Sequence, residues 1–331
     1  MSHIGISQTL GGNAVFNFLK QSNTAQLSAF GGLNVSAPGK DVGMGFQNPA
    51  LLRKEMHQQL NTSFNAFVAG ISNYSLTGAW HLEEAKTNIG LGINYFNYGN
   101  IDQTDASGNI SGSFRPRDYV VQVMASRSHK EKWWYGATLK FIHSGYGQYR
   151  SSGIAMDVAL NYHDTDKGLQ AGIVVKNMGT QLSTYDGTGR KEELPFDLQA
   201  GVTKKLENAP VQFSISFHDL HRFNNFYNDT SFRAGEGDDD FTKKNTLQKI
   251  FNHVVIAAQF FPHEKIELTT GYNFQRRQDL NGFNISNGLN GFTLGTAVIL
   301  PKIHIRYATG FYQRQLFHQF SLNFNLKGNA F

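Results

Sequence analysis

Apolar and polar side chains alternate along most of this chain, and the alternation restricts the fold more than any other feature. Two clear examples are residues 211–217 (VQFSISF) and 320–326 (FSLNFNL). Successive side chains of a β-strand point to opposite faces, so each stretch carries an apolar row on one face and a small or polar row on the other. The pattern predicts extended strands and an all-β fold class.

The alternation predicts about fourteen strands. Most of them exceed the roughly 5 to 6 residues of an average globular strand. They approach the roughly 9 to 11 residues with which a tilted strand crosses a bilayer. The predicted strands are residues 60–67, 72–81, 87–98, 116–128, 133–143, 153–163, 168–175, 196–205, 210–219, 253–262, 264–275, 291–299, 302–310 and 316–326.

The connections between these strands alternate in length. Residues 83–86 and 164–167 are short, mostly charged turns, whereas residues 99–115 and 220–252 are long. Short turns at one end and long loops at the other are typical of bacterial outer-membrane barrels. The sequence therefore predicts a transmembrane antiparallel β-barrel in the outer membrane, with extracellular long loops and both termini periplasmic.

Aromatic residues at strand ends agree with a barrel. Tyr95, Phe96 and Tyr98 form one such group, and Trp133-Trp134-Tyr135 forms another, where interfacial girdles are expected. The alternative is a large soluble all-β protein. It is disfavoured because its exposed strand edges and outward apolar rows would promote aggregation.

Composition excludes several other classes. No stretch reaches the roughly 18 apolar residues of a transmembrane helix. The chain has no cysteine, so it can form neither a disulfide framework nor a thiolate metal site. Its net charge of +5 is scattered rather than gathered in a stripe, so we expect no nucleic-acid partner. Residues 1–8 lack a basic start and an apolar core, so we expect this to be a processed chain.

Residues 1–59 read differently from the rest. Asn13 is a candidate cap for a short helix through Leu19, and Asn48 with Pro49 marks a second helix start. Glycines make the stretch between them irregular. We expect a plug or hatch segment over residues 1–59, inside a barrel formed by residues 60–331. A periplasmic anchor is the alternative.

Residues 41–52 (DVGMGFQNPALL) resemble the hatch segment of the FadL-type long-chain fatty acid transporters, which are fourteen-stranded barrels. Asn48, Pro49 and Ala50 carry the hatch motif. Residues 11–19, 98–114 and 194–221 are similar to the FadL-like, PorV-like barrels of the type IX secretion system of Bacteroidetes. Together these stretches cover much of the chain.

The resemblance implies a non-enzymatic structural subunit of the attachment complex of that system. Such a barrel holds a PorZ-like surface protein through its extracellular loops, as the related PorV holds the sortase-like PorU, and it lies among outer-membrane lipid and lipopolysaccharide. The alternative is a FadL-like outer-membrane transporter of hydrophobic molecules. A transporter should have an apolar pocket connected to an opening in the wall, whereas a docking barrel can be plugged and sealed.

The loop 220–252 contains candidate partner-docking residues, because aromatic anchors beside charges suit interfaces. A solvated loop or a calcium site are alternatives, although the carboxylate spacing matches no EF-hand. The candidate docking residues are Phe223, Phe226, Tyr227, Phe232, Asp238, Asp239 and Asp240.

No other pattern points to a metal or a reaction. His218 and His221 stand three apart on a predicted strand, which places them on opposite faces and disfavours joint ligation of a metal. The sequence contains no G-x-S-x-G elbow, and no set of serine, histidine and acid stands out. We therefore expect no enzymatic activity, no catalytic residues, no metal and no cofactor.

Overall fold

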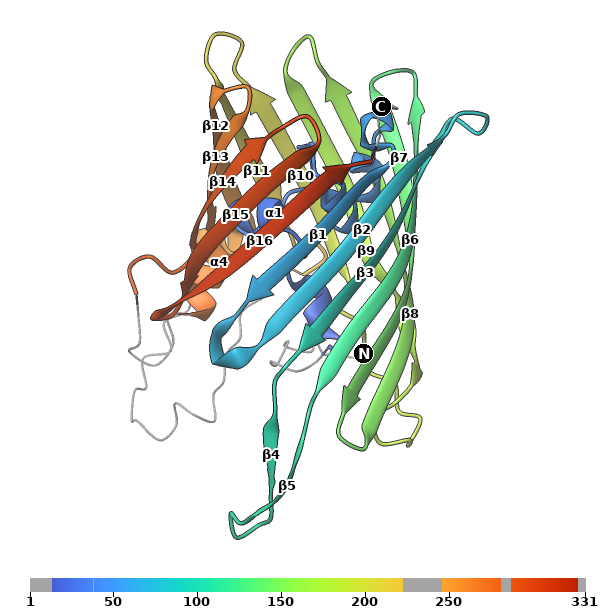
Figure 1. The fold of residues 1–331 in the computed structure, drawn as a ribbon, viewed down its shortest axis with the longest axis vertical. Helices are drawn as coiled ribbons and strands as arrows, with labels where there is room; N and C mark the ends of the chain where they lie inside the picture. The colour runs from blue at the N-terminus through green and yellow to red at the C-terminus, as the bar shows by residue number, and fades with distance from the viewer. Residues whose placement is uncertain (1–13, 38, 223–245, 281–286, 327–331) are drawn as a thin grey trace, which may run out of the picture.

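The computed structural model describes residues 14–37, 39–222, 246–280 and 287–326. Fourteen antiparallel strands form a closed barrel in the order β1-β16-β15-β14-β13-β12-β11-β10-β9-β8-β7-β6-β3-β2 (Figure 1). Each neighbouring pair is hydrogen-bonded, including the closing pair β1 and β16. The predicted all-β fold with about fourteen strands is confirmed.

The strands of the barrel are β1 (Gln59–Ala66), β2 (Ser72–Leu82), β3 (Thr87–Asn97), β6 (Arg117–His129), β7 (Trp133–Tyr146), β8 (Tyr149–Asp164), β9 (Leu169–Ser183), β10 (Asp197–Lys205), β11 (Val211–Phe217), β12 (Val254–His263), β13 (Ile266–Asn273), β14 (Phe292–Ile299), β15 (Ile303–Tyr312) and β16 (Gln315–Asn325). A separate two-stranded sheet consists of β4 (Ile101–Thr104) and β5 (Ile110–Phe114). Two further helices, α3 (Thr246–Phe251) and α4 (Phe274–Asp279), lie in the connections after β11 and β13.

The two faces of the wall differ in chemistry. On β8, Ile154 and Met156 are exposed on the outer face, whereas Ala155 and Asp157 are buried in the lumen. Large apolar side chains are exposed on the outside of the other barrel strands as well. An outward apolar band around a polar interior is the pattern of a transmembrane barrel, because lipid covers the outer face. No helix among the described residues is long and apolar enough to cross a membrane.

The long-loop end of the barrel is less open than the sequence suggests. Residues 144–152 were expected to form a loop, but β7 and β8 continue until Tyr146 pairs with Tyr149. Gly147, with φ at +63°, makes this tight turn. Strands β15 and β16 are also joined by two residues, 313 and 314. Long and short connections therefore share this end.

The long connection predicted over residues 99–115 is present between β3 and β6, but it contains a hairpin that was not predicted from the sequence. The hairpin β4–β5 extends away from the barrel there (Figure 1). Its turn is held by Asp105, whose carboxylate accepts hydrogen bonds from the backbone of Ser107 and Asn109, both at 2.9 Å. Strands of four and five residues are too short to show a clear alternation.

The described residues before β1 lie inside the barrel (Figure 1). They form α1 (Ala25–Ala29) and short 3₁₀ turns, η1 (Asn17–Lys20), η2 (Val42–Phe46), η3 (Pro49–Leu51) and η4 (Lys54–Met56), and we call residues 14–58 the plug segment. The predicted helix through Leu19 is replaced by η1, because Phe16 has a left-handed backbone with φ at 59°. Asn13 lies outside the described residues.

The backbone of the plug segment packs directly on glycines of the wall. A side chain at Gly136 of β7 would place its Cβ 2.6 Å from backbone atoms of Pro49 and Ala50. At Gly271 of β13 it would lie 2.5 Å from the carbonyl carbon of Phe30. Glycine allows this close approach because it has no side chain. The plug segment is therefore seated on two opposite parts of the wall.

The two ends of the described chain lie at opposite ends of the barrel. Val15 donates a backbone hydrogen bond to Glu193, in the long connection between β9 and β10. Asn325, at the end of β16, donates one to Lys302 in a short turn. The described part of the plug segment thus starts at the long-loop end. Residues 1–13 lie outside the described residues, so the expectation that both termini are periplasmic stays a prediction. That the long-loop end is extracellular remains a prediction.

Candidate functional site

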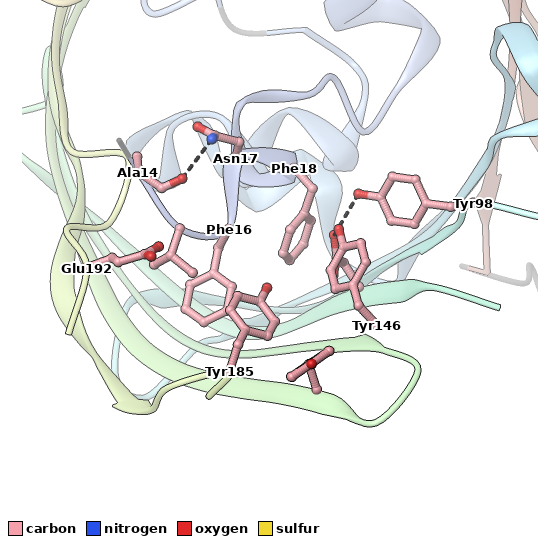
Figure 2. Close-up of a pocket in the computed structure, with 11 residues that line it drawn as sticks. Ala14, Phe16, Asn17, Phe18, Tyr98, Tyr146, Tyr185 and Glu192 are labelled. Carbon is pink, nitrogen blue, oxygen red and sulfur yellow. Dashed lines mark hydrogen bonds between the residues drawn. The ribbon is translucent and has the colours of Figure 1, made fainter. Parts of the chain in front are cut away.

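An aromatic pocket of about 420 Å³ opens at the long-loop end, where the plug segment meets the wall (Figure 2). We call it the mouth pocket. It combines the start of the plug segment with residues from the ends of β3, β6, β7 and β8 and from the connection between β9 and β10. Its lining residues are Ala14, Val15, Phe16, Asn17, Phe18, Tyr98, Asp118, Tyr146, Tyr149, Tyr185 and Glu192.

Three tyrosines form one wall of the mouth pocket. The ring centroids of Tyr98 and Tyr146 are 5.9 Å apart, and those of Tyr146 and Tyr185 are 5.8 Å apart in an edge-to-face arrangement. Phe16 and Phe18 of the plug segment face them and are buried. Aromatic pairs at such distances fix one another's orientation. The pocket therefore has preformed apolar walls.

The carboxylate of Asp118 accepts hydrogen bonds from hydroxyl groups of this wall. Its Oδ2 accepts hydrogen bonds from Tyr98 at 2.6 Å and from Tyr146 at 3.2 Å, and its Oδ1 accepts one from Ser144. Tyr185 donates in turn to Ser144 at 2.5 Å. Burial, and next the charge of Asp118, raise the pKa of Tyr98 above its usual value. The hydroxyl groups of the three tyrosines thus donate to residues of the wall rather than to a molecule in the pocket.

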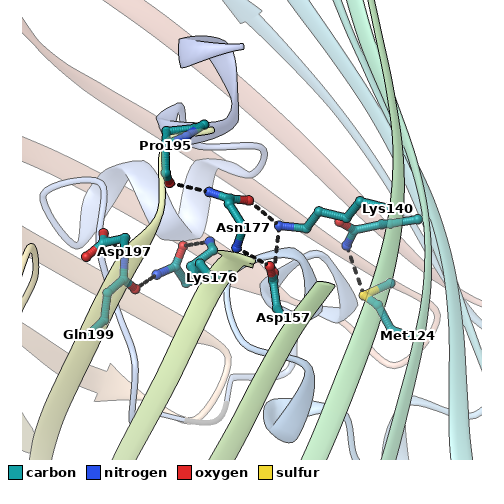
Figure 3. A network of polar contacts seen from close by, with 10 residues as sticks. Met124, Lys140, Asp157, Lys176, Asn177, Pro195, Asp197 and Gln199 are labelled. Carbon is teal, nitrogen blue, oxygen red and sulfur yellow. Dashed lines mark hydrogen bonds and ion pairs between the residues drawn. The ribbon is translucent and has the colours of Figure 1, made fainter. Parts of the chain in front are cut away.

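A second, more polar cavity of about 290 Å³ lies between the plug segment and strands β9, β10 and β13. Lys176 reaches into it and donates to Gln47 of the plug segment at 2.8 Å. Gln47 donates to Gln199 at 2.5 Å, and Gln199 donates to Asp197 at 2.5 Å (Figure 3). The chain of contacts ties the plug segment to β9 and β10.

A buried ion pair lies next to this cavity. Lys140 Nζ and Asp157 Oδ2 are 2.6 Å apart, and their side chains are 4% and 0% exposed (Figure 3). Lys140 also donates to the side chain of Asn177 at 2.8 Å, and the backbone of Asn177 donates to Asp157 at 2.8 Å. Strand β9 has a bulge here, because Lys176 and Asn177 together face Asp157.

The structure places the residues predicted from sequence as follows. Asn48 caps η3 by accepting a hydrogen bond from the backbone of Ala50, which confirms the predicted start, although the turn ends at Leu51. Asn48 and Ala50 are fully buried and belong to the plug. The seven docking candidates between Phe223 and Asp240 all lie outside the described residues.

His218 and His221 do not face each other across a site. His221 packs edge-to-face on Phe196, with centroids 4.9 Å apart. His218 instead lies beside Asp197 and Asp219, and donor atoms of these three lie within 4.8 Å of one another. Spacing along the sequence missed this group, because Asp197 comes from the neighbouring strand.

The mouth pocket was also missed. Tyr98 was expected in an interfacial girdle, but it turns towards Asp118 at the mouth of the barrel. Tyr146 and Tyr185 come from other connections, and Phe16 comes from the plug segment. Only the frequency of tyrosine next to the long-loop ends of the strands was visible in the sequence.

Comparison with known proteins shows the fold. No family model matches the sequence, and no curated protein matches it. Among solved structures, the chain is similar to the toluene transporter TodX of P. putida, with a TM-score of 0.53 and 12% identity over 92% of this chain and 97% of that one. A TodX monoaromatic hydrocarbon channel mutant gives a TM-score of 0.55 with the same identity and coverage. The fold is therefore that of an outer-membrane β-barrel.

Proposed function

We propose that this chain is a FadL-like barrel of the outer membrane that takes up a small hydrophobic molecule, with the mouth pocket as its capture site. The observation that carries the proposal is the preformed aromatic pocket at the long-loop end. Concave, mostly apolar pockets with a few fixed polar groups are the usual form of small-molecule sites. The structural similarity to a toluene transporter supports the same reading.

The charged residues around the mouth pocket disfavour a negatively charged ligand. Among the lining residues that the structure describes, Asp118 and Glu192 are acidic and none is basic. A fatty acid carboxylate would be repelled there, because two like charges in a partly desolvated site interact unfavourably. An uncharged aromatic molecule meets no such penalty. The proposed cargo is therefore not a fatty acid.

Passage beyond the mouth pocket requires a local movement. All neighbouring barrel strands are hydrogen-bonded, and the plug segment occupies the lumen. Phe16 and Phe18 form the inner side of the pocket. Phe18 lies in the short turn η1 and Phe16 directly precedes it, so neither belongs to the wall. We propose that displacement of η1 connects the pocket to the lumen.

Toluene binding tests the capture site. We expect toluene to bind the purified barrel in lipid nanodiscs, and Tyr185→Ala to weaken binding about tenfold, since an aromatic contact contributes about 0.5–1.5 kcal/mol beyond buried area. Saturation-transfer NMR measures the affinity. Tyr135→Ala is the matched control, because Tyr135 is 46% exposed on the outer face. Equal affinities of the two variants would contradict the proposal.

A second candidate function is docking. The sequence also resembles PorQ, a barrel of the type IX secretion system, and this resemblance implies that the chain holds a PorZ-like surface protein. The supporting observation is the hairpin β4–β5, which extends from the long-loop end and exposes Ile101 by 44% and Ile110 by 67%. Exposed apolar residues on a projecting element suit a protein interface.

Affinity purification of the tagged barrel from its native membrane tests docking. We expect a PorZ-like surface protein to co-purify, and deletion of residues 102–113 to reduce its recovery at least fivefold. A deletion within the short turn at residues 83–86 serves as the control at the opposite end. If no surface protein is recovered and hydrophobic uptake fails on gene deletion, docking is refuted and transport is supported.

A further inference from the structure

Asp118 is a buried carboxylate at the mouth pocket that forms no ion pair with a described residue, although the imidazole of His143 lies near enough to interact with its charge. The residue is 2% exposed. Within the described part of the chain, no lysine, arginine or histidine forms an ion pair with it. By contrast, Asp157 lies 2.6 Å from Lys140. A buried charge without a counter-ion is unfavourable, so a cation in the pocket would stabilise Asp118.

The aromatic wall suits the same kind of ligand. Tyr98, Tyr146 and Tyr185 direct their hydroxyl protons to Asp118 or Ser144, so a ligand in the pocket meets mainly aromatic rings. The face of an aromatic ring carries partial negative charge and attracts cations within about 6 Å. Glu192 at the edge of the pocket adds a further negative charge. The aromatic rings and the two carboxylates therefore both favour binding of a cation.

We infer that the mouth pocket prefers an organic cation with an apolar body, such as a quaternary ammonium group, over an uncharged molecule of the same shape. The inference rests on the proposed function, because it names the preferred charge of the ligand in that pocket. Quaternary ammonium groups are bound in aromatic cages elsewhere for the same reason. They carry positive charge on a surface that contacts rings well and is weakly hydrated.

A small inorganic cation does not fit these observations as well. The hydroxyl groups around Asp118 are donors to it, at 2.6 and 3.2 Å from the tyrosines. Hard cations require several oxygen ligands around one point. The mouth pocket offers one buried carboxylate and extended apolar walls over about 420 Å³. The ligand should thus be bulky as well as positively charged.

Choline and its uncharged isostere 3,3-dimethyl-1-butanol test the inference directly. The barrel is placed in nanodiscs that contain lipid without net charge and no detergent. We expect it to bind choline at least tenfold more tightly than the isostere. Isothermal titration calorimetry at pH 8 and low salt measures both affinities. Asp118→Asn should lower the affinity for choline about tenfold more than it lowers the affinity for the isostere. Asp102→Asn, an exposed change of equal charge on β4, should alter neither.

Two further results complete the test. If Asp118→Asn does not fold, Glu192→Gln at the exposed edge should still weaken choline binding about twofold, and an unchanged affinity would count against the inference. Equal affinities of choline and the isostere would overturn the cation preference. In that case, toluene binding that is sensitive to Tyr185→Ala would leave the proposed capture site standing. If toluene binding is also absent, both the cation preference and the proposed capture site are refuted.

Discussion

Replacing Gly271 by valine should turn the plugged barrel into an ion-conducting pore. The new side chain would overlap the backbone of Phe30 and Gly31, and a backbone cannot move aside as the end of a flexible side chain can. Strand β13 is hydrogen-bonded on both sides, to β12 and β14. The plug segment, which touches the wall only through side-chain and packing contacts there, should therefore yield before the wall does.

Conductance in planar lipid bilayers measures this effect. The unmodified barrel should be closed, and Gly271→Val should conduct in discrete steps, with a larger open fraction when Gly136→Val removes the second seat at Pro49 and Ala50. Gly145→Val on β7 is the control, because its added Cβ would meet no atom closer than 4.0 Å. A closed double variant would show that the plug segment is not seated through these glycines.

Breaking the ion pair between Lys140 and Asp157 should have the largest effect on stability. Removing one partner of a buried pair costs about 3–5 kcal/mol, because the remaining charge stays buried and unpaired. Lys140→Met should therefore lower the free energy of unfolding by about that amount. Asp157 would then keep the backbone hydrogen bond from Asn177 and the more distant charge of Lys176. The bulge in β9 should loosen, and the contact of Lys176 with Gln47 should weaken with it.

Urea unfolding of the barrel in lipid vesicles, followed by tryptophan fluorescence, measures the loss. The double variant Lys140→Met with Asp157→Leu should recover most of it, since apolar replacement of both partners leaves no unpaired charge. Lys54→Met is the control at the exposed pair with Glu83, where the cost should stay below about 1 kcal/mol. Similar losses at Lys140 and Lys54 would contradict this account.

The strands were predictable because their signal is local. Residues alternate on β8 and β11 because one face of each strand contacts lipid and the other faces the lumen. The side chains of a single strand are therefore enough to reveal the pattern. The turn at Asn48 and Pro49 was predictable for the same reason, because the capping side chain and the backbone N–H that donates to it lie two residues apart. The hairpin β4–β5 was not predicted from the sequence, because each of its strands is too short to show a clear alternation.

The mouth pocket could not be read from the sequence. Tyr98 lies 87 positions before Tyr185 along the chain, and Phe16 belongs to a segment whose position inside the barrel no local pattern specifies. Asp118 looked like any polar residue at a strand start. Only the tertiary structure shows that it is buried among hydroxyl groups and forms no ion pair with another described residue. Its chemistry depends on Tyr98, which follows β3, and on Ser144 and Tyr146 at the end of β7.

The sequence by itself determined a barrel, the number of its strands and the presence of an irregular segment ahead of them. Strand periodicity is a property of neighbouring residues, so no tertiary information is needed for it. Closure of β1 on β16 and the seating of the plug segment on Gly136 and Gly271 decided the rest. They brought distant residues together at the mouth, and which residues meet there is fixed by strand register and packing rather than by any local pattern.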